Sequence, residues 1–240
     1  MITSKSRSAK NQSNVRVGVV AKFSWYLDDA KRVFSDGEYE VLTFTTLDEL
    51  KNEIRINSNL DFIFFPHFSE IIPPSIYENF LCIGFHTGDL PADRGGSPIQ
   101  NKILSGKYLT NVSAFRITKD IDAGPIFKQH VIDLSEGTIV EILLNLSKIC
   151  ATMMIDIVRN SPVPIDQIGQ IEVKVRRKPI DSLLPQSNVG IRGIYDHIRM
   201  VDGLDYPSAY IVWGDLIIEF TSAKLKDGKL TANCIIREGK

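Results

Sequence analysis

The first hundred residues alternate between short apolar runs and longer segments in which apolar residues recur at helical spacing. The runs that predict buried strands are Val15–Val20, Tyr39–Phe44, Leu60–Phe65 and Leu81–Phe85. The segments that predict helices are Trp25–Phe34, Leu47–Ile56, a short stretch opened by Pro73 and Pro74, and Pro98–Leu104. This alternation favours an α/β fold, in which helices cover both faces of a mostly parallel sheet.

The rest of the chain changes character in two steps. Strands are predicted within Val112–Ile117 and Gly124–Leu134, followed by a long apolar helix over Val140–Val158. Beyond Pro164 the pattern predicts a strand (Ile171–Val175), a polar loop (Arg176–Ser187), a helix (Ile191–Met200) and antiparallel strands in Tyr206–Trp213, Leu216–Phe220 and Leu230–Ile236. We therefore expect a disordered tail over residues 1–14, an α/β domain over 15–175 and a small C-terminal α+β subdomain over 176–240.

Composition and charge narrow the possible partners. The 240 residues carry 28 Lys and Arg against 29 Asp and Glu, a formal net charge of −1. Nucleic-acid binders draw most of their affinity from a basic excess, so we expect no nucleic-acid partner. The basic stretch Lys174–Lys178 is explained more simply as a solvated face.

Three cysteines without a CxxC pattern predict neither a disulfide framework nor a zinc site, and we expect no metal. No apolar run approaches the roughly 20 residues that cross a bilayer. The N-terminal segment also lacks a signal-peptide core. These features predict a cytoplasmic protein without a membrane partner.

Candidate chemistry is concentrated in the stretch FHTGDLPADRGGSP, residues 85–98. His86 follows an apolar run and could act as a general base, or equally be a hydrogen-bonded surface histidine. Asp122 lies in DAG and is, taken alone, better explained as a turn residue. Paired with a histidine, however, such an aspartate orients the imidazole and stabilises its charged form.

Two longer segments carry a family resemblance. FHTGDLPADRGGSPIQNKIL and ITKDIDAGPIF resemble the folate-dependent formyltransferases, most strongly between Asp61 and Leu134. That family has an Asn-x-His signature, an Arg-Gly loop, a helix opened by Pro-Ile-Gln and a later Asp-x-Gly. Here Asp122 follows His86 by 36 residues. The resemblance implies a Rossmann-like domain that uses 10-formyltetrahydrofolate.

The family's asparagine is missing from this chain, because Gly84 stands two residues before His86. The loop wording, together with RRKPIDS and IYDHIRMVDGLDYPSAYI, is similar to the sugar N-formyltransferases, including those of the pseudaminic-acid pathway. This branch implies an acceptor amine on a nucleotide-linked amino deoxysugar.

The resemblance also implies roles for particular residues. The expected catalytic residues are His86 and Asp122. The expected folate-binding residues are Phe68, Ile71, Ile72, Thr118 and Asp120. The expected acceptor-binding residues are Arg94, Gly95, Gly96, Ser97 and His67. His67 is a candidate for the missing donor, although packing beside the folate explains it better; Asn101 is a weaker candidate.

Two other functions stay open at this point. One is a methionyl-tRNA formyltransferase, which the neutral charge and small C-terminal subdomain disfavour. The other is a non-catalytic protein that binds folate or a nucleotide sugar, motivated by Gly84 but disfavoured by the presence of both His86 and Asp122. The antiparallel C-terminal strands have edges through which a homodimer could form.

Overall fold

The computed structural model describes residues 15–57, 59–187, 189–204 and 206–239, so the predicted tail over residues 1–14 lies outside the described part. A six-stranded sheet with the order β2-β1-β3-β4-β6-β7 forms the centre. Its strands are β1 (Val15–Val20), β2 (Tyr39–Phe44), β3 (Phe62–Phe65), β4 (Cys82–Thr87), β6 (Leu109–Arg116) and β7 (Ile126–Asp133). The first four in this order run parallel, and β6 and β7 are antiparallel. The predicted α/β fold with a mostly parallel sheet is confirmed.

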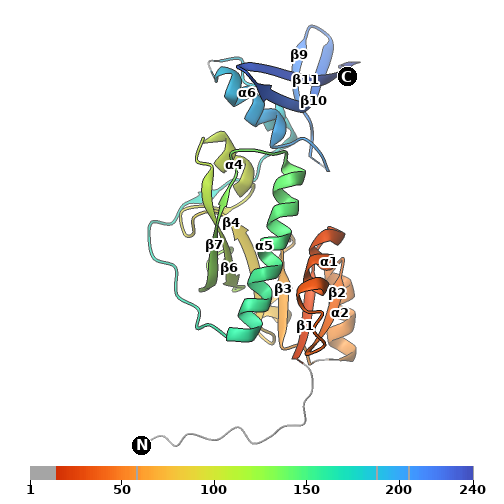
Figure 1. Ribbon diagram of the computed structural model, residues 1–240, viewed down its shortest axis with the longest axis vertical. Helices are drawn as coiled ribbons and strands as arrows, with labels where there is room; N and C mark the ends of the chain where they lie inside the picture. Colours follow the sequence, from red (N-terminus) through yellow and green to blue (C-terminus); the bar gives the residue numbers. More distant parts are fainter. Residues whose placement is uncertain (1–14, 58, 188, 205, 240) are drawn as a thin grey trace, which may run out of the picture.

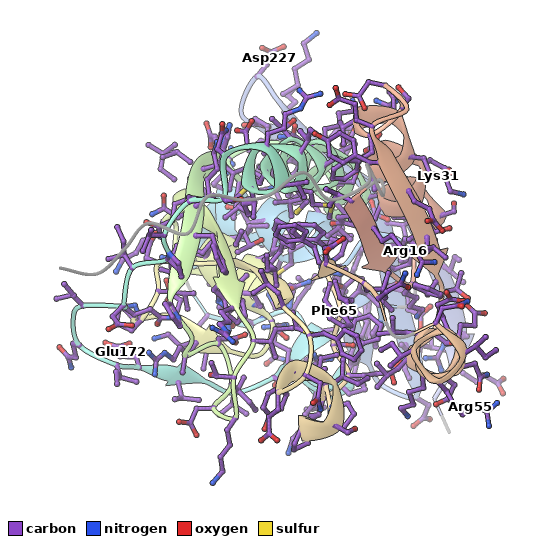
Figure 2. The ribbon with its side chains drawn as sticks, turned by 90° about the horizontal axis from the view of Figure 1, so that it is seen from below. Arg16, Lys31, Arg55, Phe65, Glu172 and Asp227 are labelled. Carbon is purple, nitrogen blue, oxygen red and sulfur yellow. The ribbon has the colours of Figure 1, made fainter. Side chains whose placement is uncertain are left out.

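Helices cover both faces of this sheet and create two apolar cores. Helices α1 (Ser24–Val33) and α5 (Ile139–Asn160) pack on one face, and α2 (Leu47–Ile56) and α3 (Pro74–Tyr77) on the other. Figure 2 shows this layering, with α5 spanning one side of the sheet. The long helix begins where a capping box forms, because the Thr138 side chain accepts from the backbone N–H of Glu141 and the Glu141 carboxylate accepts in return.

The C-terminal region adds a smaller unit at one end of the sheet (Figure 1). It contains a 3-10 helix (Pro179–Ser182), helix α6 (Gly190–Arg199) and strands β9 (Ala209–Trp213), β10 (Leu216–Lys226) and β11 (Lys229–Glu238). These three strands form an antiparallel sheet with the order β11-β10-β9. The domain boundary between residues 175 and 176 stays a prediction.

Helix α6 is fastened to the α/β domain by a fully buried arginine. The Arg199 guanidinium donates to Asp196 Oδ1 at 2.6 Å, to the carbonyl oxygen of Gly137 at 2.8 Å and to that of Leu134 at 2.7 Å. Tyr108, on the loop before β6, donates to Asp196 Oδ2 at 2.5 Å. Every polar group of this buried cluster therefore has a partner from the other unit or from the helix itself.

Some sequence-based boundaries were wrong, for reasons of strand pairing. Strand β4 continues through His86 and Thr87, because both pair with the antiparallel strand β6 that follows later in the chain. The strand expected over Ile171–Val175 is only β8 (Val173–Lys174), paired with the two-residue β5 (Arg94–Gly95). The expected polar loop after it contains the 3-10 helix. Across the described residues, no helix is long and apolar enough to span a bilayer.

Candidate active site

His86 lies near the carboxyl end of β4, at the edge of the sheet where α/β folds place their ligands. Its backbone pairs with Ser113 of β6, so two strands hold it. Residues two apart on a strand share a face, and Gly84 therefore lies on the same side of the sheet as His86. The side chain is only 6% exposed, which excludes the alternative of a solvated surface histidine.

Asp122 contacts His86 directly. Its Oδ2 lies 3.3 Å from His86 Nδ1 and also accepts from the backbone N–H of Gly95 at 2.9 Å. Asp122 has a φ of +52°, a left-handed conformation that aspartate tolerates better than most residues. The structure thus brings the two predicted catalytic residues together, and the turn explanation and the orienting explanation of Asp122 both hold.

The other ring nitrogen of His86 is covered by the neighbouring loop. Nε2 donates to the carbonyl oxygen of Asp93 at 2.6 Å. Lys102, on helix α4 (Pro98–Leu104), holds this loop with its Nζ 2.6 Å from both the Asp89 and the Asp93 carboxylates. Burial lowers the pKa of Lys102, but these two hydrogen-bonded carboxylates outweigh it and raise that pKa above its ordinary value. Both nitrogens of the imidazole therefore face oxygen acceptors.

The place of the missing asparagine is filled by an aromatic ring. A Cβ on residue 84 would lie 2.8 Å from Phe115 Cζ and 3.1 Å from Phe115 Cε1. Phe115 belongs to β6 and pairs with Gly84 across the sheet. Glycine at position 84 is therefore matched to its neighbour, and no amide can project beside His86 from this strand without displacing Phe115.

The expected acceptor loop is assembled next to Asp122. Arg94 and Gly95 form β5, and Ser97 Oγ accepts from the backbone N–H of Arg177 at 3.1 Å. Gly95 must be a glycine, since its φ is +101° and a Cβ there would lie 2.4 Å from the carbonyl oxygen of Lys174. Gly96 is equally crowded, because a Cβ there would lie 2.5 Å from Cα of Arg176.

His67 lies elsewhere on the same edge of the sheet, after β3. Its ring stacks on Tyr26 at a centroid distance of 6.0 Å and lies 6.0 Å from the Phe23 ring. Burial, together with the positive charges of Arg176 and Lys22, lowers the pKa of His67 from 6.5 to about 4. This histidine is consequently neutral near pH 7, and cations surround it. Its recorded ring contacts place it among aromatic residues, as the packing alternative expected.

The five residues expected to bind folate fall into separate places. Ile72 is buried in the core beneath α2 and α3, and Phe68 packs against the same core. Ile71 is 82% exposed. Thr118 and Asp120 share one turn, in which the Thr118 hydroxyl donates to the carbonyl oxygen of Asp120 at 3.4 Å. Their assignment to folate stays a prediction.

A cavity of about 370 Å³ lies instead along the start of β7 and the segment after α5. It is lined by Leu90, Ile126, Phe127, Lys128, Gln129, Ile165, Asp166, Gln167 and Ile168. Sequence reasoning missed residues 165–168, because they lie in a segment without periodicity. Their only signal is a polar pair between two isoleucines. Within the described ranges, no group of three or more His, Cys, Asp or Glu side chains could hold a metal ion.

Comparison with known proteins identifies the class. The family model described as "Methionyl-tRNA formyltransferase, C-terminal domain" matches residues 179–237. The methionyl-tRNA formyltransferase of Rickettsia massiliae is 32% identical over 213 residues, covering 84% of this chain and 69% of that protein. A solved structure described as methionyl-tRNA formyltransferase from Clostridium thermocellum is 39% identical with a TM-score of 0.87, covering 94% of this chain and 100% of that one.

The α/β fold and the histidine–aspartate pair are thus those of a formyltransferase. Within that class, the chain belongs to the folate-dependent formyltransferase family, as the resemblance in its motifs implied. The similar proteins above carry the name methionyl-tRNA formyltransferase, which weighs against our expectation that nucleic acid is not a partner. The matches span 45% to 64% of the length of four other curated methionyl-tRNA formyltransferases.

More distant solved structures share the fold alone. A 4-N formyltransferase from Francisella tularensis is 18% identical with a TM-score of 0.65, covering 83% of this chain and 93% of that one. HypX from Aquifex aeolicus, solved in complex with tetrahydrofolic acid, is 15% identical with a TM-score of 0.73, covering 88% of this chain and 38% of that one. The sugar branch suggested by the sequence motifs is therefore unconfirmed.

Proposed function

We propose that this protein transfers a formyl group from 10-formyltetrahydrofolate to a primary amine. The observation that carries the proposal is the pair of His86 Nδ1 and Asp122 Oδ2, 3.3 Å apart at the carboxyl end of β4, in a chain of the formyltransferase family. A protein that only binds folate has no need for this pair. The non-catalytic alternative is therefore the weaker one.

His86 has the role of general base. The acceptor amine attacks the formyl carbon, a new N–C bond forms, and His86 Nε2 removes one proton from the amine. The bond from the formyl carbon to N10 of the folate then breaks, and the proton passes to the leaving nitrogen. Asp122 holds Nδ1 and stabilises the positive charge on the ring. For Nε2 to act, its hydrogen bond to the Asp93 carbonyl must be exchanged for one to the amine.

The cavity beside Gln167 fits the folate. Its volume of about 370 Å³ lies within the usual range for small-molecule sites, and isoleucine, leucine and phenylalanine walls alternate with a few polar groups. Gln167, one of its lining residues, donates to the carbonyl oxygen of Asp122 at 2.8 Å, so the cavity borders the catalytic turn. When bound there, the folate supplies the activated formyl group.

The acceptor we favour is methionyl-tRNA, which replaces our expectation of an amino sugar. The support is the name shared by the relatives at 32% and 39% identity, and the match of residues 179–237 to the C-terminal domain of methionyl-tRNA formyltransferases. Two cations, Arg176 and Lys22, act on His67 at the same edge of the sheet. Positive charge at this place suits an acceptor that carries phosphate.

A nucleotide-linked amino sugar, such as the UDP-4-amino sugar of the pseudaminic-acid pathway, is the second candidate. Two observations favour it. The chain is short relative to curated methionyl-tRNA formyltransferases, spanning 45% to 64% of four of them. Its net charge of −1 also gives no general attraction to RNA. The diphosphate of such a sugar would use the same cations.

The test is formyl transfer from 10-formyltetrahydrofolate to two acceptor sets: methionyl-tRNA, and a panel of UDP- and dTDP-linked amino sugars. The His86→Asn variant runs beside the wild type, with His130→Asn, at an exposed strand position, as the matched control. We expect turnover of methionyl-tRNA, a loss of roughly a hundredfold or more in His86→Asn, and little change in His130→Asn. Turnover restricted to one sugar would transfer the assignment to the second candidate. Folate binding without turnover of any acceptor would refute the proposal.

A further inference from the structure

One residue outside the family motifs is connected to both loops of the site. Gln167 belongs to the segment over residues 161–172, which leaves the end of α5 and runs past the outer side of β7 towards β8 (Figure 1). Glu172, at the far end of this segment, lies on the opposite side of the molecule from Arg55 of α2 (Figure 2). The segment is anchored where Ile126 and Ile165 exchange backbone hydrogen bonds of 2.8 and 2.9 Å.

Both ends of the Gln167 amide are used. Nε2 donates to the carbonyl oxygens of Asp122 and Gly124, each at 2.8 Å. Oε1 accepts from Arg94 Nε at 3.1 Å and from Arg94 Nη2 at 2.8 Å. An amide is the one neutral side chain that offers a double donor and a double acceptor in this arrangement. Gln167 thus cross-links the Asp122 turn and the Arg94 loop.

The turn that Gln167 holds is conformationally costly. Asp122 has a φ of +52°, a conformation that costs roughly 1–2 kcal/mol for a non-glycine residue. Gly124 has no room for a side chain, since a Cβ there would lie 1.8 Å from the carbonyl oxygen of Arg116. The Arg94 loop, in turn, contributes the Gly95 N–H that holds the Asp122 carboxylate. The distance between Asp122 and His86 therefore depends on both loops that Gln167 joins.

We propose that Gln167 is a positioning residue for the reaction: it fixes the Asp122 turn against the Arg94 loop so that the Asp122 carboxylate faces His86. The inference rests on the proposed formyl transfer. Gln167 acts through Asp122, although its side chain also lines the cavity. Its loss should therefore lower kcat far more than it raises the KM for the folate.

The decisive variant is Gln167→Glu. The new carboxylate keeps the shape and can still accept from Arg94, but it turns an oxygen instead of an N–H towards the Asp122 and Gly124 carbonyls. We expect kcat to fall roughly 10- to 100-fold, because small misplacements of catalytic groups have effects of this size. The KM for 10-formyltetrahydrofolate should change less than about threefold. Gln170→Glu, an exposed glutamine of the same segment, is the matched control and should keep wild-type kcat.

A merely structural role is separated by a double-mutant cycle. If Gln167 acts through Asp122, Gln167→Glu should have little further effect on kcat in an Asp122→Ala background. Gln167→Met removes the donors without adding a charge, and gives the same test should the glutamate variant fold poorly. Equal losses of kcat in both backgrounds, or a raised folate KM with unchanged kcat, would overturn the proposal. A wild-type protein without turnover would instead refute the function on which it rests.

Discussion

Gly84 shows how a departure from a family motif is balanced by one neighbouring side chain. The ring of Phe115 fills the space into which a side chain at position 84 would project. Gly84→Asn restores the family residue but inserts four heavy atoms into this contact. We expect the variant to lose about 1–3 kcal/mol of unfolding free energy, the usual effect of overpacking. Urea denaturation measures this directly.

The matched control is a cycle with Phe115→Ala. If the ring is the obstacle, Gly84→Asn should cost much less in the Phe115→Ala background than in the wild type. A penalty that is equal in both backgrounds would mean that the strand backbone, and not the Phe115 ring, excludes a side chain at position 84.

His67 predicts a dependence of stability on pH. Its pKa is about 4 in the folded protein because of burial and the charges of Arg176 and Lys22, against 6.5 ordinarily. Between these values the unfolded chain binds a proton that the folded protein does not, so stability falls as the pH is lowered through this window. The contribution is at most about 3 kcal/mol, since each pKa unit is worth 1.36 kcal/mol.

The measurement compares unfolding free energies at pH 7 and pH 4.5. His67→Asn removes the titration and suits the left-handed backbone, since His67 has a φ of +47°. We expect the variant to lose less stability on acidification than the wild type. His130→Asn, at an exposed position, should behave as the wild type does. Equal acid sensitivity of all three proteins would show that His67 does not titrate as described.

At the scale of elements, strand and helix patterns carried most of the fold but not its strand ends. The strands Val15–Val20 and Tyr39–Phe44 were predicted with their observed bounds, because β-branched and aromatic runs are local signals. The extension of β4 through Thr87 depends on β6, which lies more than 20 residues later. A local pattern cannot reveal such pairing.

The candidate site divides in the same way. His86 and Asp122 were predicted from motif spacing, and the structure places them in contact. Gln167 and the cavity were not predicted, because their partners are 43 to 73 residues away in the sequence and their segment has no regular period. Long-range contacts of irregular segments leave little trace in a single sequence.

Helix α6 gives an element-scale prediction through Arg199. Replacing this fully buried residue in Arg199→Met leaves the Asp196 carboxylate and the carbonyls of Leu134 and Gly137 without their donor. Removing one partner of a buried pair typically costs about 3–5 kcal/mol. We expect that loss in urea denaturation, together with faster proteolysis after residue 176. Arg237→Met, which breaks the exposed pair with Glu219, should cost less than about 1 kcal/mol.

At the scale of the whole molecule, charge distinguishes the two acceptors. The chain has a net charge of −1, so any RNA binding must come from a local patch such as that around Arg176 and Arg177. Three phosphate contacts would give a logarithmic salt slope of about −2.7, hence a rise of about 40-fold in the acceptor KM between 50 and 200 mM KCl.

A nucleotide-linked sugar carries only two phosphates next to the reacting group, so its KM should rise less than about fivefold over the same range of salt. The KM for 10-formyltetrahydrofolate, measured in the same assays, corrects for general effects of salt on the enzyme. The double variant Arg176→Gln and Arg177→Gln should flatten the salt dependence for methionyl-tRNA, because removing each phosphate contact lowers the slope by about one. If methionyl-tRNA is turned over with a KM that salt does not change, the basic patch is not its binding surface, and recognition must rest on the amino acid and the uncharged parts of the acceptor end.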